Sequence, residues 1–234
     1  MLSELPFYIP LLFIFTTIIT LLFFIAAIKK NKSGNRSVMI SLVLIAWLSL
    51  QAILALDYFY TVTDRIPPRF ALLVLPPFLA IIVLFITTGG RKFIDSLSLE
   101  ILTRLHVVRL FVEIILFWLY LYKYVPSLMT FEGRNFDILA GLTAPLVAYY
   151  GFKKHALSRT FMLGWNIVSL LLLLNIVINA VLSAPFPFQQ FAFDQPNIAV
   201  LYFPFVWLPG FIVPVVLFSH LVLLRRLSKN GGFN

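Results

Sequence analysis

The sequence has no cysteine and little charge. Without cysteine, the chain offers no thiol nucleophile, no disulfide and no cysteine ligand for zinc or an iron–sulfur cluster. Any metal chemistry would therefore depend on histidine and carboxylate side chains. Charged residues make up only 12% of the 234 residues, while 61% are hydrophobic, and the mean hydropathy is +0.99. A soluble globule of this size could not bury that much apolar surface, so the composition predicts a membrane protein.

Seven apolar segments are long enough, or nearly long enough, to cross a bilayer. We therefore expect an all-α fold, in which residues 1–234 form one transmembrane domain built as a bundle of seven helices. The fifth segment is the shortest and holds Gly141 and Pro145. A re-entrant loop here would place the basic residues at 153–159 outside, against the positive-inside rule, so we interpret the segment as a short, kinked or tilted crossing. The predicted spans are residues 5–28, 37–60, 69–88, 105–125, 136–152, 161–183 and 198–224.

Two features of the connections and spans add detail to this prediction. Apolar residues follow a helical period through residues 89–104, which predicts an amphipathic interfacial helix that runs into the fourth span. Pro76 and Pro77 lie inside the third span, and prolines and a glycine interrupt the seventh. Proline removes a backbone donor, so we expect kinks in both spans.

The distribution of basic residues predicts the orientation. One side of the predicted topology carries 13 basic residues and the other side carries four. By the positive-inside rule, the N-terminus is outside and the C-terminus is cytoplasmic in a multi-pass protein of the cell membrane. The 13 are Lys29, Lys30, Lys32, Arg36, Arg91, Lys92, Arg104, Lys153, Lys154, Arg159, Arg225, Arg226 and Lys229, and the four are Arg65, Arg69, Lys123 and Arg134.

The formal net charge of +9 bears on partners. In a soluble protein it would suggest nucleic acid, but here the charge follows topology. We therefore expect membrane lipids as partners, including anionic lipids at the cytoplasmic face, and no nucleic acid. The sequence does not indicate the oligomeric state.

Three ionisable side chains, His106, Arg109 and Glu113, interrupt the fourth span. At 100° per residue they fall within a sector of about 60°, and Tyr120 continues the same stripe. Charge inside a membrane is costly, so it normally turns toward other helices or a wet cavity and indicates a functional site. We predict a ligand-binding site at this stripe.

Other polar residues are candidates for the same site. Amide side chains in the second and sixth spans are available as partners of the stripe, and the network is either a structural clasp or the lining of a binding site. The outer loop after the fourth span adds a second polar cluster. The amides are Gln51, Asn166, Asn175 and Asn179, and the outer-loop cluster is Glu132, Arg134 and Asp137.

Histidines near the cytoplasmic face raise the question of a metal. His106 and His220 would lie on the fourth and seventh spans, where two imidazoles could hold a haem or contribute to a divalent metal site. The sequence has no H-x-x-x-H or H-E-x-x-H spacing. We therefore predict no cofactor and leave haem or a divalent metal as the alternative.

Three functions fit these residues. The leading hypothesis is the binding or transport of a small polar or anionic solute that meets Arg109, with Glu113 as counter-ion or proton carrier. The alternative is a non-catalytic membrane assembly factor or sensor, in which the polar network only holds the helices together. The third is a metal- or haem-dependent membrane enzyme, and we favour the two non-enzymatic functions over it.

Overall fold

The structure is a computed structural model of the chain that describes residues 2, 4–29 and 35–228. The described residues form helices and no strand, which confirms the predicted all-α fold. Three of the basic residues used to predict the orientation, Lys30, Lys32 and Lys229, lie outside the described residues.

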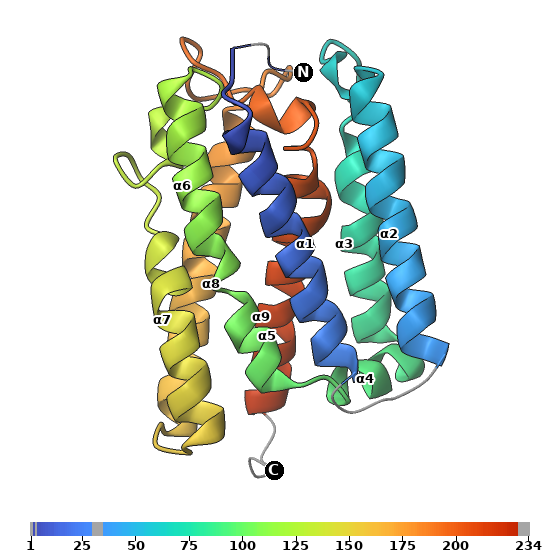
Figure 1. Cartoon of the computed structure of the whole chain (residues 1–234), viewed down its shortest axis with the longest axis vertical. Coiled ribbons are helices and arrows are strands. Elements are labelled where there is room, and N and C mark those ends of the chain that lie inside the picture. Colours follow the sequence, from blue (N-terminus) through green and yellow to red (C-terminus); the bar gives the residue numbers. More distant parts are fainter. Residues whose placement is uncertain (1, 3, 30–34, 229–234) are drawn as a thin grey trace.

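Most of the helices run along the long axis of the molecule, and the start of α1 (Tyr8–Lys29) and the end of α9 (Val213–Ser228) lie at its opposite ends (Figure 1). The short helix α4 lies across this axis, and α5 and α6 follow one another along it. The helices are α1 (Tyr8–Lys29), α2 (Asn35–Leu56), α3 (Ala71–Ile86), α4 (Thr88–Asp95), α5 (Leu99–Leu105), α6 (Val108–Leu121), α7 (Ile138–Ala148), α8 (Arg159–Leu182) and α9 (Val213–Ser228).

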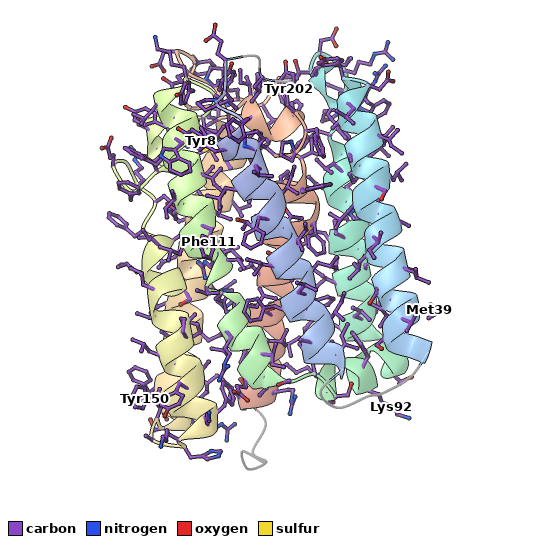
Figure 2. The ribbon with its side chains drawn as sticks, in the orientation of Figure 1. Tyr8, Met39, Lys92, Phe111, Tyr150 and Tyr202 are labelled. Atoms are coloured by element: carbon purple, nitrogen blue, oxygen red, sulfur yellow. The ribbon has the colours of Figure 1, made fainter. Side chains whose placement is uncertain are left out.

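The outer faces of the bundle are strongly apolar. Met39 on α2 points away from the bundle (Figure 2) and is 61% exposed, and Ile53 on the same helix is 65% exposed. Side chains of this kind belong in lipid. Among the described residues, four helices are long and apolar enough to cross a membrane, or five if α3 and α4 form one bent span. The chain therefore has the features of a membrane protein. The number of seven crossings and their orientation remain predictions.

The prediction of one continuous helix over residues 89–104 is wrong. It consists of α4, which is bent by 92° from α3, and the separate helix α5. The Thr87 hydroxyl accepts from the backbone N–H of Gly90 and caps α4. Ser98 caps α5 in the same way and donates its own backbone N–H to Ala27 of α1 at 3.1 Å. The two N-caps satisfy backbone N–H groups at the starts of α4 and α5, so each helix begins separately.

The predicted fourth and fifth spans are also shorter or broken. The fourth is interrupted at His106 and Val107, between α5 and α6. The fifth consists of α7 and one π-helical turn, Tyr149–Lys153. Residues 130–137 approach α7 without helical structure, so side chains must satisfy their backbone groups.

The seventh predicted span contains a comparable irregularity. A π-helical turn, Leu208–Ile212 (η5), precedes α9. Pro214 has no N–H to offer the carbonyl of Gly210 four residues earlier, and the Trp47 indole donates to that carbonyl at 2.9 Å instead. The Trp207 indole donates to the Leu48 carbonyl at 3.0 Å. These two bonds tie α2 to the irregular start of α9.

Candidate functional site

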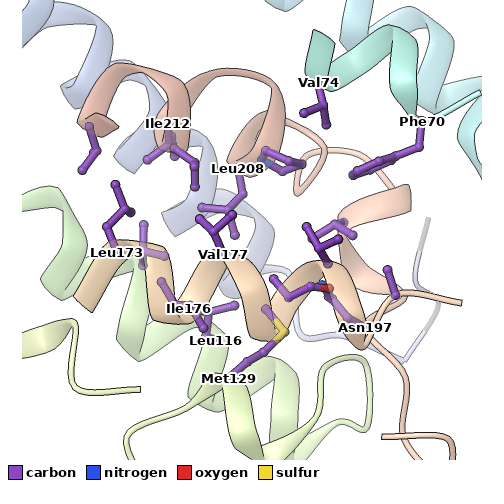
Figure 3. Close-up of a pocket in the computed structure, with 18 of the residues that line it drawn as sticks. Phe70, Val74, Leu116, Met129, Leu173, Ile176, Val177, Asn197, Leu208 and Ile212 are labelled. Atoms are coloured by element: carbon purple, nitrogen blue, oxygen red, sulfur yellow. The ribbon is translucent and has the colours of Figure 1, made fainter. Parts of the chain in front are cut away.

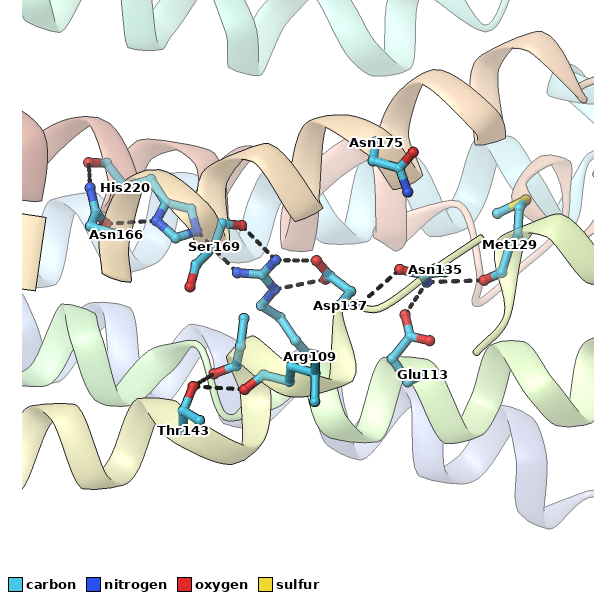
Figure 4. Close-up of polar contacts among 12 residues, drawn as sticks. Arg109, Glu113, Met129, Asn135, Asp137, Thr143, Asn166, Ser169, Asn175 and His220 are labelled. Atoms are coloured by element: carbon cyan, nitrogen blue, oxygen red, sulfur yellow. Dashed lines mark hydrogen bonds and ion pairs between the residues drawn. The ribbon is translucent and has the colours of Figure 1, made fainter. Parts of the chain in front are cut away.

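Arg109 on α6 lies at the centre of a buried polar cluster (Figure 4). Its Nε donates to Asp137 Oδ2 at 2.7 Å, and its Nη2 donates to Asp137 Oδ1. Nη2 also donates to the backbone carbonyl of Ser169 on α8 at 2.9 Å. Asp137 directly precedes α7, and both charged residues are buried. The bidentate pair therefore neutralises Arg109 inside the bundle.

Arg109 also contacts α9, through the side chain of His220. Arg109 Nη1 lies 3.0 Å from His220 Nε2. A guanidinium can only donate, so Nε2 accepts and the ring proton sits on Nδ1. Nδ1 then donates to Asn166 Oδ1 at 2.7 Å, while Asn166 Nδ2 donates to the His220 carbonyl at 3.1 Å. These bonds select one neutral tautomer of His220 and join α6, α8 and α9.

Asn135 links the second carboxyl group of the cluster to the chain before α7. Its Nδ2 donates to Glu113 Oε1 and, at 3.0 Å, to the carbonyl of Met129. Its Oδ1 accepts the backbone N–H of Asp137 at 3.0 Å. The buried amide of Asn135 thus provides hydrogen-bond partners for backbone groups of Met129 and Asp137. Non-helical backbone inside a membrane protein requires such partners.

Two sequence-based expectations for this cluster need correction. The counter-ion of Arg109 is Asp137, whereas Glu113 bonds to Asn135. Asp137 does not join Glu132 and Arg134 in an outer-loop cluster, because those two side chains are exposed while Asp137 is buried. Nor does the Asp137 side chain cap α7. Its carboxylate is directed to Arg109 instead.

His106 occupies the break between α5 and α6 and stacks on His220. Their ring centroids are 4.1 Å apart with an interplanar angle of 27°, and Trp165 contacts His106 edge-on at 5.8 Å. His106 is fully buried, and neither of its ring nitrogens has a partner among the described residues. It therefore joins the cluster by ring stacking and not by hydrogen bonds.

The remaining predicted residues bond elsewhere. Asn175 donates to the Arg134 carbonyl at 2.7 Å, and Asn179 donates to the Asn175 carbonyl at 3.0 Å. Gln51 accepts from the hydroxyl of Tyr60. The backbone carbonyl of Tyr120 accepts a hydrogen bond from the Gln195 side chain at 3.0 Å. These groups tie loops to helices outside the Arg109 cluster.

The predicted metal alternative finds little support in the geometry. Both ring nitrogens of His220 are used by Arg109 and Asn166. Within residues 2, 4–29 and 35–228, no group of three or more His, Asp or Glu side chains is arranged to hold a metal ion. Of the two candidate histidines, only His106 has ring nitrogens without partners among the described residues.

A cavity of about 290 Å³ reaches the Arg109 cluster from between α3, α8 and η5. Figure 3 shows Val74 of α3, Val177 of α8 and Leu208 of η5 pointing into it. All but four of its lining residues have apolar side chains. The four polar ones are Arg109, Glu113, Asp137 and Asn197.

The cavity also reaches the apolar surface of the bundle. Leu75 on α3, Val181 on α8 and Phe188 in the following loop line it, and their exposed fractions are 55%, 46% and 43%. Helices α3 and α8 each pack against α9. The space between α3 and α8 therefore offers an entry from the surface that would face lipid.

Residues 66–228 match the family model described as Domain of unknown function (DUF8737). The chain belongs to this family, and the matched region contains the whole Arg109 cluster and the whole cavity. No curated protein and no solved structure matches the chain.

Proposed function

We propose that this protein binds a lipid-like small molecule in the cavity between α3, α8 and η5, and holds or carries it within the membrane. The observation that supports the proposal is an apolar cavity that reaches the molecular surface and is lined by the buried carboxyl group of Glu113, whose Oε2 has no hydrogen-bond partner among the described residues. Ligand sites typically combine apolar walls with a few convergent polar groups, and their volumes begin at about 300 Å³.

The proposal changes the ligand expected from sequence. The sequence predicts a small polar or anionic solute that meets Arg109, but that cation already has Asp137 as its counter-ion. An anion would have to displace a bidentate carboxylate from a buried site. The apolar walls instead suit a molecule that is mostly hydrocarbon, which would enter from the membrane between α3 and α8.

We extend the proposal to the topology. Seven crossings would consist of α1, α2, α3, α5 with α6, α7, α8 and α9, with the N-terminus outside the cell membrane and the C-terminus cytoplasmic. Figure 2 supports this arrangement, because Lys92 lies at the same end of the bundle as Tyr150. Tyr150 belongs to the π-helical turn Tyr149–Lys153, which ends in a basic residue. That end also holds the last described turn of α9, with Arg225 and Arg226. Basic residues gathered at one end are typical of a cytoplasmic face, where we expect anionic lipids as partners.

Native mass spectrometry with 1-decanol tests the binding proposal. Val177→Phe places a larger side chain in the cavity, and Ile178→Phe makes a similar change on an adjacent residue that is 56% exposed. We expect a one-to-one decanol adduct with the wild type and with Ile178→Phe, and its loss with Val177→Phe. Equal adducts in all three proteins would reject the cavity as the binding site.

The alternative is a non-catalytic assembly factor or sensor, in which the cluster holds the helices together. The bonding of Arg109 supports it, because its hydrogen bonds reach Asp137, Ser169 and His220 on three other segments. Under this alternative, decanol forms no specific adduct with the wild type. Loss of Asp137 would still lower the recovery of folded protein.

A further inference from the structure

One carboxyl oxygen of Glu113 has no hydrogen-bond partner in the described part of the chain. The residue is 1% exposed and lines the cavity. Its Oε1 accepts from Asn135 Nδ2, so the oxygen without a partner is Oε2. A buried polar atom without a partner is costly, so a ligand that bonds to Oε2 removes that cost. Whether the ligand must accept or donate depends on the proton of Glu113.

The charges around Glu113 indicate that its carboxyl group is protonated. The charge of Arg109 is compensated by the bidentate carboxylate of Asp137. His220 is neutral, because its Nε2 accepts from Arg109. The side chain that bonds to Glu113 is the uncharged amide of Asn135. A second negative charge would therefore be buried without a counter-ion, and a carboxyl group in that position holds its proton instead.

The proton of Glu113 belongs to Oε2. Oε1 accepts from Asn135, so it is the carbonyl oxygen of the acid and Oε2 is the hydroxyl. This hydroxyl is a buried donor without an acceptor among the described residues. Arg109 also lines the cavity, and its printed bonds use four of its five N–H groups, which leaves one more donor. The cavity wall at α6 therefore offers hydrogen-bond donors from two residues.

Asn197 has the opposite polarity in another part of the cavity wall. Its Nδ2 donates to the Ala180 carbonyl at 3.1 Å, while Oδ1 is buried and has no partner in residues 2, 4–29 and 35–228. An amide oxygen can only accept. Ala180 lies 11 residues after Ser169, the residue on α8 that bonds to Arg109, which corresponds to about 16 Å of helix. A ligand group that needs a donor is therefore matched at α6 and not at Asn197.

We propose that the ligand is a neutral single-chain lipid whose polar end is a hydrogen-bond acceptor, such as the carbonyl of a ketone or an ester, and that the Oε2 hydroxyl of Glu113 donates to it. This inference rests on the proposed binding function and specifies the chemistry of the ligand. An anionic head group would find Arg109 already paired with Asp137, whereas a neutral one adds no charge to the cluster. 1-Decanol meets the same requirement, because a hydroxyl oxygen also accepts.

Two probes of the same shape test the acceptor. 2-Undecanone carries a carbonyl oxygen, and 2-methyl-1-undecene has a CH₂ group in place of that oxygen. Native mass spectrometry gives the affinity of each protein variant for both probes. The ratio of the two affinities is compared between variants, because the partition of the probes into detergent is then the same in every sample.

Glu113→Gln and Glu113→Met separate the donor from the acid. Asn135 donates to Oε1, so glutamine places its oxygen there and its NH₂ group, a donor, where Oε2 was. Methionine has a similar length and no donor. We expect the ketone-to-alkene ratio of the wild type and of Glu113→Gln to be about tenfold above that of Glu113→Met, the factor that one net hydrogen bond gives. The control is Glu132→Met, on an exposed loop residue, which should keep the wild-type ratio.

Infrared spectroscopy detects the hydrogen bond itself. A carbonyl that accepts a hydrogen bond absorbs at a lower frequency than the same carbonyl in a hydrocarbon solvent. The difference between spectra with unlabelled and carbonyl-carbon-13 2-undecanone isolates the band of the ligand from the bands of the protein. We expect the bound ketone to absorb below its frequency in dodecane with the wild type, and at that frequency with Glu113→Met. If Glu113→Met does not fold, a wild-type band at the dodecane frequency overturns the inference.

The outcomes separate this inference from the function on which it rests. An equal ketone-to-alkene ratio in the wild type and Glu113→Met overturns the inference. A ratio that is higher in Glu113→Gln than in the wild type overturns the assigned proton, and the inference with it. In both cases, the loss of both probes with Val177→Phe leaves the binding function intact. If Val177→Phe changes the binding of neither probe, the function and the inference are both overturned.

Discussion

Arg109 and Asp137 are 28 residues apart in the sequence and form a buried bidentate ion pair between α6 and the start of α7. This pair defines the role of the cation. Arg109 links helices and positions His220, whereas Oε2 of Glu113, a residue that lines the cavity, has no hydrogen-bond partner among the described residues.

Asp137→Ala should strongly destabilise the protein. The substitution leaves the guanidinium of Arg109 buried without its counter-ion, which costs about 3–5 kcal/mol. The free energy of unfolding in detergent measures the effect. Glu132→Ala removes an exposed carboxylate nearby and should change this free energy by less than about 0.5 kcal/mol.

The double substitution Arg109→Met with Asp137→Leu extends this test. It removes both charges, so its unfolding free energy should exceed that of Asp137→Ala alone. A double variant that is no more stable than Asp137→Ala would contradict the account of a compensated pair.

His106→Phe and His220→Phe should differ although the two rings stack on each other. His106 has no hydrogen bond among the described residues to lose, whereas His220 uses both ring nitrogens with Arg109 and Asn166. His220→Phe should therefore be less stable than His106→Phe by about 1–3 kcal/mol. Thermal unfolding of the purified variants measures the difference, and equal losses would contradict the two hydrogen bonds assigned to the His220 ring.

Gly141 allows α7 to approach α6 next to the ion pair. A Cβ atom at this position would lie 2.7 Å from the backbone nitrogen of Leu110, which cannot move aside as a side-chain tip can. Gly141→Ala should therefore lower the melting temperature. Gly164→Ala on α8 is the control, because nothing lies within 4 Å of its added Cβ. Alanine is the better helix former by about 1 kcal/mol, so the control should be neutral or stabilising.

Local periodicity predicted part of the site. The helical spacing of His106, Arg109 and Glu113 places them on one face, and all three are buried. The same reasoning could not find Asp137 as the partner, because that contact depends on how residues 130–137 enter the bundle. Asn135, which holds this segment in place, has the sequence appearance of an ordinary loop residue.

The breaks in the predicted spans were equally hard to foresee. No glycine or proline marks the interruption at His106 and Val107, so apolar length predicted one continuous helix there. The cavity depends on the separation of α3 from α8, which is a property of packing. Sequence therefore indicated the class of protein and the buried stripe, while tertiary contacts form the cavity.

Photoaffinity labelling with a decanol derivative that carries a diazirine on its chain tests the central claim most directly. The account predicts that the label attaches to residues around Val74, Val177 and Leu208, that unlabelled 1-decanol displaces it, and that Val177→Phe abolishes it. Labels spread over the exposed faces of α1 and α2, unaffected by competing decanol, would contradict it.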